Sequence, residues 1–300
     1  MKIFYNNLKV TVTGGCGFIG SHLAIELVNL GARVTIIDDL STGNLENIQP
    51  IKDKITFINK SITDYQACLE ATKNAEVIFH LAAFISVPLS LEQPQLCHET
   101  NVNGLVNILE AARINGVKRL TFSSSAAVYG TNEDVCSEST ATNPQSPYGY
   151  TKLIGELYCQ QYAKNFGINT VILRYFNVYG PRQNPAGSYA AVVATFMDRM
   201  KNNLPITIFG NGSQTRDFVP VSQVVQANLN LAIKADQCAG QTFNIATGKS
   251  ITLLELIEQL KPDFPDYAID LRFLPARAGD VKSSIADCSK YRQVTDQLHQ

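Results

Sequence analysis

Residues 9–27 read KVTVTGGCGFIGSHLAIEL, in which four glycines separate two apolar stretches. The first stretch, 9–14, is short and rich in β-branched residues, which is typical of a buried strand. The second stretch lies within 18–30 and has the apolar spacing of a helix. Glycine is favoured at such a junction because the turn is tight and the helix must pack on the strand without a Cβ between them. This strand–turn–helix unit predicts an α/β fold.

The same alternation of strand and helix continues along the first 175 residues. The predicted strands are mostly apolar throughout, as expected when both faces of a sheet are covered. They lie at 9–14, 33–38, 55–59, 76–83, 119–124 and 170–175. The predicted helices lie at 18–30, 64–73, 99–115 and 147–166. We therefore expect a Rossmann-type, doubly wound parallel sheet.

The pattern changes from residue 176 onward, where Gly, Pro and Asn interrupt the apolar runs. We expect 1–175 to form the larger domain, with 221–251 returning to it. Residues 176–220 and 252–300 should form a smaller, mixed substrate lobe. Ligands of open α/β sheets bind at the carboxyl ends of the strands, so this lobe should close over that edge.

Composition excludes several classes of protein. The 300 residues carry a net charge of −1, which is too little positive charge for a sequence-independent nucleic-acid or anionic-membrane surface. No apolar run approaches the roughly 20 residues of a membrane span, and the N-terminus lacks a signal-peptide pattern. The seven cysteines are scattered and the four histidines isolated, so we expect reduced thiols and no metal site. These features predict a cytoplasmic protein.

The glycine-rich turn also predicts a ligand. The N-terminus of the helix that follows offers N–H groups and a positive dipole end to a pyrophosphate. Asp38 ends the next predicted strand, where a carboxylate would accept hydrogen bonds from both hydroxyls of an adenosine ribose. No arginine follows it in DDLSTGN (38–44), so a 2′-phosphate would be repelled. The cofactor predicted is NAD in preference to NADP.

A second constellation predicts the chemistry. Tyr148 and Lys152 are four residues apart in SPYGYTKLIGE (146–156), on one face of a predicted helix. A phenol has a reference pKa of about 10, which the lysine charge and the positive nicotinamide should lower. The serines at 123–125 end a predicted strand, and one of them could donate to the same substrate oxygen. Together these groups would take a proton from an alcohol while its carbon gives up hydride.

These motifs resemble the extended short-chain dehydrogenase/reductase family, and within it the nucleotide-sugar 4-epimerases, most of all those that act on UDP-N-acetylglucosamine. The resemblance covers residues 9–290. It rests on TGGCGFIGSHL, NVNG, SSSAAVYG, SPYGYTK, RYFNVYGPRQNPAGSYAAV and RDFVPV.

The resemblance implies roles for particular residues. The catalytic triad would be Ser125, Tyr148 and Lys152. Besides Tyr148 and Lys152, the implied NAD contacts are Gly14, Gly17, Phe18, Ile19, Gly20, Asp38, Ile62, Ala82 and Asn101. The implied UDP-sugar contacts are Ser86, Asn177, Arg216, Arg277 and Ser284. The two arginines would bind its phosphates. Ser123 and Ser124 would either support the site or contact substrate hydroxyls. A homodimer is also implied, in which 99–115 and 147–166 form a four-helix bundle.

Two features limit the reactions and substrates that the resemblance implies. Related dehydratases and decarboxylases carry acidic residues just after the serine, where this chain has Ala126 and Ala127. The resemblance therefore implies epimerisation at C4 through a 4-keto sugar. Ser284 aligns with the family position whose size gates the C2 substituent. Its small side chain implies that N-acetylhexosamines are accepted, with UDP-glucose and UDP-galactose as further candidate substrates. The segment QNPAGSYAAV (183–192) agrees with this.

Two departures from the family pattern are evident. Ser61 stands where an aspartate usually contacts adenine, so the backbone near Ile62 is expected to hold that ring instead. Family members also usually continue some tens of residues past ADCSK (286–290), so a less complete second lobe is expected.

Rival interpretations remain at this stage. Within the same fold, the sequence is also compatible with a UDP-glucuronate 4-epimerase or a nucleotide-sugar reductase. A non-catalytic NAD-binding scaffold is a remote alternative, because such a protein would be expected to have lost Tyr148 or Lys152.

Overall fold

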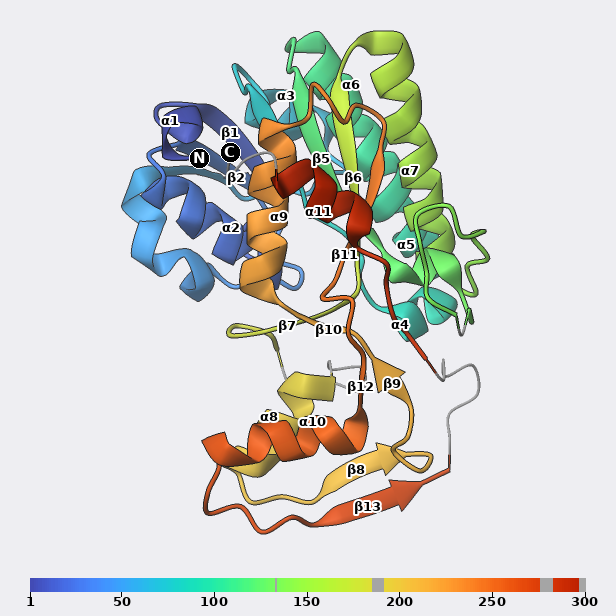
Figure 1. Cartoon of the computed structure of the whole chain (residues 1–300). Helices are drawn as coiled ribbons and strands as arrows, with labels where there is room; N and C mark the ends of the chain where they lie inside the picture. The colour runs from blue at the N-terminus through green and yellow to red at the C-terminus, as the bar shows by residue number, and fades with distance from the viewer. Residues whose placement is uncertain (133, 185–191, 276–282, 297–300) are drawn as a thin grey trace.

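A seven-stranded parallel sheet organises the larger part of the molecule (Figure 1). The computed structural model describes residues 1–132, 134–184, 192–275 and 283–296. Strand order in the sheet is β11-β6-β5-β4-β1-β2-β3. These strands are β1 Lys9–Thr13, β2 Arg33–Ile37, β3 Ile55–Ile58, β4 Val77–His80, β5 Arg119–Ser125, β6 Asn169–Tyr175 and β11 Thr242–Ile245. The doubly wound parallel sheet expected from the sequence is confirmed.

Helices cover both faces of this sheet. The apolar side chains of α3, α6 and α7 pack on one face, and those of α2 and α9 on the other. Their bounds are α2 Phe18–Asn29, α3 Tyr65–Ala71, α6 Gly104–Ile114, α7 Pro147–Phe166 and α9 Val221–Ile233. The predicted helix at 99–115 is divided, because a π-helical turn, η2 Glu99–Asn103, precedes α6. Both faces of the sheet are therefore buried, which explains why its strands are apolar throughout.

Shorter elements connect these layers. They are α1 Lys2–Tyr5, η1 Leu45–Lys54, α4 Val87–Glu92, α5 Pro94–His98 and η3 Ala126–Tyr129. Among the described residues, no helix combines the length and apolar character needed to cross a bilayer.

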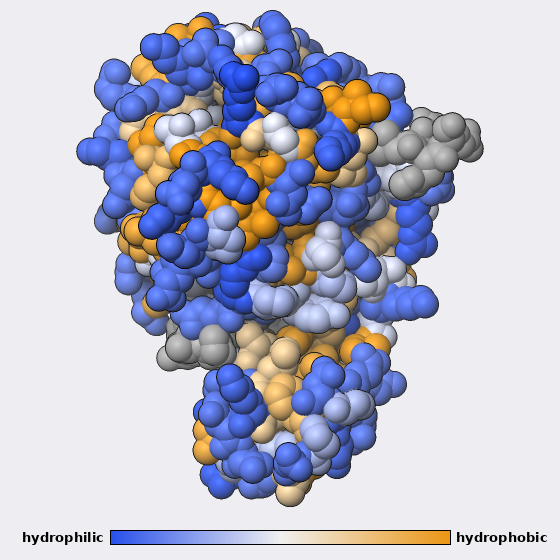
Figure 2. Space-filling model, turned by 90° about the vertical axis from the view of Figure 1, so that its left-hand side faces the viewer, coloured by the Kyte–Doolittle hydropathy of each residue, from blue (hydrophilic) through white to orange (hydrophobic). Residues whose placement is uncertain are grey.

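A smaller body lies below the carboxyl ends of the large sheet (Figure 1). Its core is apolar and includes Val193, Phe196 and Ile257. Its helices are α8 Val192–Lys201, α10 Leu253–Leu260 and η4 Lys261–Asp263. Its paired strands are β8 Ile206–Phe209 with β13 Leu271–Leu274, β9 Thr215–Arg216 with β12 Ile251–Thr252, and β7 Asn177–Tyr179 with β10 Phe218–Pro220. Figure 2 shows this body as the narrower lower part of the molecule.

The last described helix, α11 Ser289–Asp296, lies on the larger sheet. Tyr291 and Val294 pack against the core that β11 forms with α9, and Lys290 Nζ donates to the carbonyl oxygen of Thr242 at 2.9 Å. The sequence was expected to place 252–300 with the smaller lobe, so 289–296 differ from that expectation. Tertiary contacts decide its location, because SKYRQVTD is a polar segment and its pattern does not tell which body its few apolar side chains meet. The other domain boundaries remain predictions.

Candidate active site

The glycine-rich turn brings the backbones of β1, α2 and β4 into close contact. Gly14 has φ +68°, and a Cβ there would lie 2.7 Å from the backbone nitrogen of Ala82. A Cβ on Gly20 would clash with the carbonyl oxygen of Gly14. Gly17 caps α2 without a side chain, and Phe18 and Ile19 begin the helix. The cradle thus presents the N-terminus of α2, which suits the pyrophosphate of a dinucleotide.

Asp38 lies beside this turn at the end of β2. Its carboxylate is buried and accepts hydrogen bonds from the N–H groups of Cys16, at 2.8 Å, and Leu40, at 2.9 Å. Burial raises the pKa of Asp38, and these two hydrogen bonds oppose the rise. A Cβ on Gly43 would approach Asp38 Oδ1 to 2.9 Å. The residues present fit a ribose whose hydroxyls donate to the carboxylate, so the chain accommodates NAD.

The predicted adenine contact involves a turn whose polar groups are already partly engaged. The hydroxyl of Ser61 accepts from the N–H of Thr63 at 3.3 Å. The carbonyl oxygen of Ile62 accepts from Asn107 Nδ2 at 3.0 Å. Ser61 thus stabilises the turn that precedes α3, and an adenine contact near Ile62 stays a prediction.

Asn101 and Ala82 flank the carboxyl end of β4. The side chain of Asn101 accepts from the N–H of Phe84 at 2.7 Å and donates to Thr151 Oγ1 at 2.9 Å. It therefore ties the loop after β4 to helix α7. The N–H of Ala82 donates to Thr13 Oγ1 at 3.0 Å. These contacts lie within the protein, and the roles of both residues toward NAD stay predictions.

The structure brings the predicted triad together at the carboxyl end of β5. Ser146 caps α7 by accepting from the N–H of Gly149 at 3.1 Å, with Pro147 at the first helical position. This start places Tyr148 in the first turn, where its side chain shares a hydrogen bond with Ser125. One turn later, Lys152 Nζ donates to the carbonyl oxygen of Ser123 at 2.8 Å. A serine, a phenol and an amine thus converge, as a proton-transfer site requires.

Burial dominates the pKa shifts of Tyr148 and Lys152 in the chain by itself. Burial raises the pKa of Tyr148, while the hydrogen bond from Ser125 lowers it by a smaller amount. Burial also lowers the pKa of Lys152 to about 8. Within the chain by itself, desolvation of the phenol outweighs this hydrogen bond. The expected lowering of the Tyr148 pKa also includes the charge of the bound nicotinamide, so it stays a prediction.

The hydroxyls of Ser123 and Ser124 are engaged within the protein. Ser123 Oγ is 3.0 Å from Tyr175 Oη, and Ser124 Oγ donates to Glu156 Oε1 at 2.5 Å. Both serines are buried. Of the two roles expected for them, these contacts are of the supporting kind.

The predicted substrate residues gather between the two bodies of the molecule. Asn177 Nδ2, on β7, donates to the carbonyl oxygen of Asp217 at 3.1 Å. The N–H of Asp217 in turn donates to the carbonyl oxygen of Ser284 at 2.8 Å. Arg216, on β9, is partly buried, and its Nη1 donates to the carbonyl oxygen of Thr215 at 2.9 Å. Asn177, Arg216 and Ser284 therefore form one cluster, although 107 residues separate the first from the last.

Two further substrate positions were predicted, Ser86 and Arg277. Ser86 caps α4, where its hydroxyl accepts from the N–H of Leu89 at 3.2 Å. Arg277 and most of the segment QNPAGSYAAV lie outside the described residues. Their roles stay predictions.

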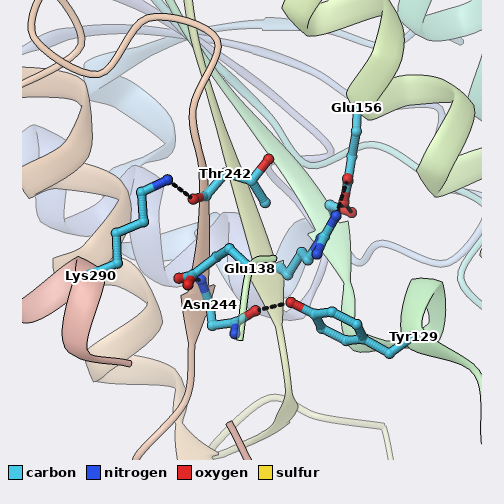
Figure 3. A network of polar contacts seen from close by, with 8 residues as sticks. Tyr129, Glu138, Glu156, Thr242, Asn244 and Lys290 are labelled. Atoms are coloured by element: carbon cyan, nitrogen blue, oxygen red, sulfur yellow. Dashed lines mark hydrogen bonds and ion pairs between the residues drawn. The ribbon is translucent and has the colours of Figure 1, made fainter. Parts of the chain in front are cut away.

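Sequence reasoning missed a buried polar network that joins β6, α7, η3 and β11 (Figure 3). Arg174, on β6, donates from Nη2 to Glu156 Oε2 at 2.7 Å, and both side chains are buried. Its guanidinium carbon lies 4.7 Å from the ring centre of Tyr129, whose hydroxyl donates to Asn244 Oδ1 at 2.7 Å. The N–H of Asn244 donates to Glu138 at 2.8 Å. Charged residues within apolar runs were the available signal for this network.

A second missed contact lies between β1 and β4. Thr13 Oγ1 is 2.9 Å from His80 Nδ1 and accepts from the N–H groups of Leu81 and Ala82. Since the threonine oxygen already accepts two hydrogen bonds, its own hydrogen goes to His80 Nδ1. His80 is therefore neutral, with its ring stacked on Phe122.

Comparison with known proteins agrees with this geometry. The model of the "NAD dependent epimerase/dehydratase family" matches residues 10–246. A UDP-glucose 4-epimerase of Mycolicibacterium smegmatis is 39% identical over 297 residues, covering 96% of this chain and 92% of the relative. The chain is thus similar to a nucleotide-sugar epimerase over nearly its whole length.

Solved structures give the same result. The UDP-N-acetylglucosamine 4-epimerase of Methanobrevibacter ruminantium, in complex with UDP-N-acetylmuramic acid, has a TM-score of 0.91 at 37% identity, covering 97% of this chain and 92% of that one. The UDP-glucose 4-epimerase of Thermotoga maritima, with UDP-glucose, has a TM-score of 0.88 at 38% identity, covering 95% and 92%. The glycine turn and Asp38 fit the cofactor in the family's description, and NAD is the cofactor of this chain. The chain belongs to the NAD dependent epimerase/dehydratase family.

Proposed function

We propose that the protein is a UDP-sugar 4-epimerase that interconverts UDP-N-acetylglucosamine and UDP-N-acetylgalactosamine. The observation that carries this proposal is the convergence of Ser125, Tyr148 and Lys152 at the carboxyl end of β5, with Ala126 and Ala127 following directly in η3. The triad supplies proton transfer at a sugar hydroxyl. The two alanines supply no carboxylate for elimination or decarboxylation.

The chain's own residues account for the proton transfers. Tyr148 takes the proton of the C4 hydroxyl as base, while Ser125 donates a hydrogen bond to the same oxygen. Bound NAD, which the glycine turn and Asp38 would hold, would supply the hydride transfer from C4 and back to its opposite face. Between the two transfers the 4-keto sugar turns over in the site, and Tyr148 gives its proton back to the C4 oxygen. The products contain all the atoms of the substrate, and no net oxidation occurs.

The preference for an N-acetyl group rests on Ser284. Its backbone lies between Thr215 and Asp217, beside Arg216, so its small side chain belongs to the cluster proposed to hold the sugar diphosphate. A serine leaves space that a tyrosine would fill. This part of the proposal is supported by the similarity to the Methanobrevibacter enzyme, whose name specifies UDP-N-acetylglucosamine.

The test is a panel of UDP-sugars incubated with the protein without added NADH or NADPH and analysed by chromatography. We expect UDP-N-acetylglucosamine to give its C4 epimer. Conversion of UDP-glucuronate alone would favour a UDP-glucuronate 4-epimerase. An absolute requirement for added NADPH would indicate a reductase, and no turnover of any sugar would favour the non-catalytic scaffold.

Replacing Ser284, the residue proposed to gate the C2 substituent, tests the preference for N-acetylated sugars separately. Ser284→Tyr should abolish activity on N-acetylated sugars by filling the space beside C2, while UDP-glucose is still converted. Ser283→Tyr is the neighbouring control, because Ser283 adjoins Ser284 in the chain and its hydroxyl is 3.1 Å from Thr215 Oγ1. Equal losses on both classes of sugar in Ser284→Tyr would place the gate elsewhere.

A further inference from the structure

Helix α7 is attached to the end of β5 at successive turns. Tyr148 shares a hydrogen bond with the side chain of Ser125, and Lys152 Nζ donates to the carbonyl oxygen of Ser123 at 2.8 Å. Tyr148 and Lys152 are four residues apart and lie on the same side of the helix. Ser124 lies between these two serines in the chain, and its side chain contacts the next turn of the helix.

Glu156 is the residue of that next turn, four positions beyond Lys152. Glu156 Oε1 accepts from Ser124 Oγ at 2.5 Å and from Arg174 Nε at 2.8 Å, and Oε2 accepts from Arg174 Nη2 at 2.7 Å. Ser124 and Arg174 are paired in register on β5 and β6. One carboxylate therefore joins the helix to two adjacent strands, one residue before the proposed catalytic serine.

The burial of this link makes it unusual. The side chains of Arg174 and Glu156 are 6% and 2% exposed. Removing two charges from water is costly, and apolar residues of similar volume often stabilise a core as well or better. What a bidentate pair adds is a fixed direction, because the planar guanidinium and the carboxylate meet in one arrangement. The Glu156–Arg174 pair therefore serves to fix the orientation of α7 rather than to raise the free energy of unfolding.

We propose that Glu156 is a positioning residue: through Ser124 and Arg174 it holds α7 where Tyr148 stays within hydrogen-bond reach of Ser125. It contacts none of the reacting atoms. Its expected effect on turnover rests on the proposed function. Displacing a reacting group by roughly 1 Å lowers the rate by about 100-fold.

Ser124→Ala is the most selective test, because it cuts the link to β5 and leaves the Glu156–Arg174 ion pair in place. We expect kcat for the UDP-sugar to fall about 10- to 100-fold while KM stays near the wild-type value. Thr121→Val is the matched control. Thr121 lies on the same strand, is equally buried, and donates its hydroxyl to Asn228 Oδ1 at 3.2 Å, away from α7.

A second readout does not depend on activity. In protein with isotope-labelled tyrosine, the NMR signal of the ring carbon that bears the Tyr148 hydroxyl reports its hydrogen bond, and its absence from Tyr148→Phe identifies it. Ser124→Ala should shift this signal and Thr121→Val should not. Glu156→Gln should shift it further if that variant folds, because Arg174 is then left without a counter-charge.

The inference is overturned if Ser124→Ala keeps both the wild-type kcat and the wild-type signal, or if Thr121→Val produces the same changes. A wild-type protein without epimerase activity would refute the proposed function instead. The NMR comparison would then still decide the positioning role.

Discussion

At the scale of single residues, Tyr148 carries the proposed proton transfer. Its hydrogen bond with Ser125 aligns the phenol with the serine, while burial keeps its pKa raised within the chain. A phenol with a raised pKa is a weaker acid, so Tyr148 keeps its proton until the cofactor binds. The charge that favours the phenolate must therefore come largely from the bound cofactor, whose nicotinamide is positive in its oxidised form.

Tyr148→Phe should lower kcat for epimerisation by about 100- to 10,000-fold, because it removes the base and leaves the packing of the ring unchanged. Binding of NAD, followed by calorimetry, should be nearly unaffected. Tyr150→Phe, two residues further along the same helix, should behave like the wild type because Tyr150 is 54% exposed. Wild-type turnover in Tyr148→Phe would contradict the assignment of the base.

His80 should make the protein less stable in acid. Burial, and to a smaller extent the charge of Lys152, lowers the pKa of His80 to about 3. The unfolded chain has a histidine pKa of about 6.5, so it binds the proton more tightly than the folded chain. The contribution of His80 to the free energy of unfolding is therefore complete above about pH 6.5 and declines as the pH falls towards 3.

Urea unfolding at a series of pH values measures this effect. His80→Phe, which keeps an aromatic ring beside Phe122, should show a smaller loss of unfolding free energy between pH 6.5 and 3 than the wild type. An identical slope in both proteins would mean that other groups cause the acid sensitivity.

At the scale of elements, the turn between β1 and α2 depends on the absence of side chains. Gly20→Ala should weaken NAD binding strongly, because the new Cβ would meet the carbonyl oxygen of Gly14 and force the cradle open. Fluorescence titration with NADH measures the affinity. Gly116→Ala is the control: nothing lies within 4 Å of its would-be Cβ, although its φ of +70° disfavours alanine by roughly 1–2 kcal/mol. If Gly20→Ala bound NADH as well as Gly116→Ala does, the cradle would be more tolerant than its geometry indicates.

Helix boundaries at this scale follow local chemistry where caps are present. Ser146 and Pro147 define the start of α7, and Thr252 with Glu255 forms a capping box at the start of α10. The division of 99–115 into a π-helical turn and α6 had no such signal. Asn101 lies in that turn, and its hydrogen bonds to Phe84 and Thr151 connect it to other elements.

At the scale of the whole molecule, we propose a homodimer through α6 and α7. The groove between η2, α6 and α7 is lined by the apolar side chains of Val106, Ile154 and Tyr158 and by polar ones that include His98 and Asn107. A second copy of the chain would cover these apolar side chains and complete a four-helix bundle.

Tyr158→Arg should convert the dimer to a monomer in sedimentation velocity experiments, because it places a charge in that interface. Leu254→Arg is a matched control on α10, since Tyr158 is 39% exposed and Leu254 is 38% exposed. It should sediment like the wild type. A wild-type protein that is monomeric at all concentrations, or a dimer that Tyr158→Arg leaves intact, would contradict the proposed interface.

By itself, the sequence determined the features that depend on short spacings. The order of strands and helices, the glycine turn, Asp38 after the second strand, and the pair Tyr148 and Lys152 all follow from neighbours within one or two turns. Their geometry is local, so each can be recognised as a motif in the amino-acid sequence.

Tertiary structure alone decided the features that depend on what packs around a group. Glu156 and Arg174 are 18 residues apart, and nothing in either local pattern predicts that they meet beneath Ser124. The direction of the Tyr148 pKa depends on desolvation by distant segments, and the location of α11 on the large sheet depends on apolar contacts with β11 and α9. Burial is a property of the assembled fold, and for that reason these properties could be found only in the structure.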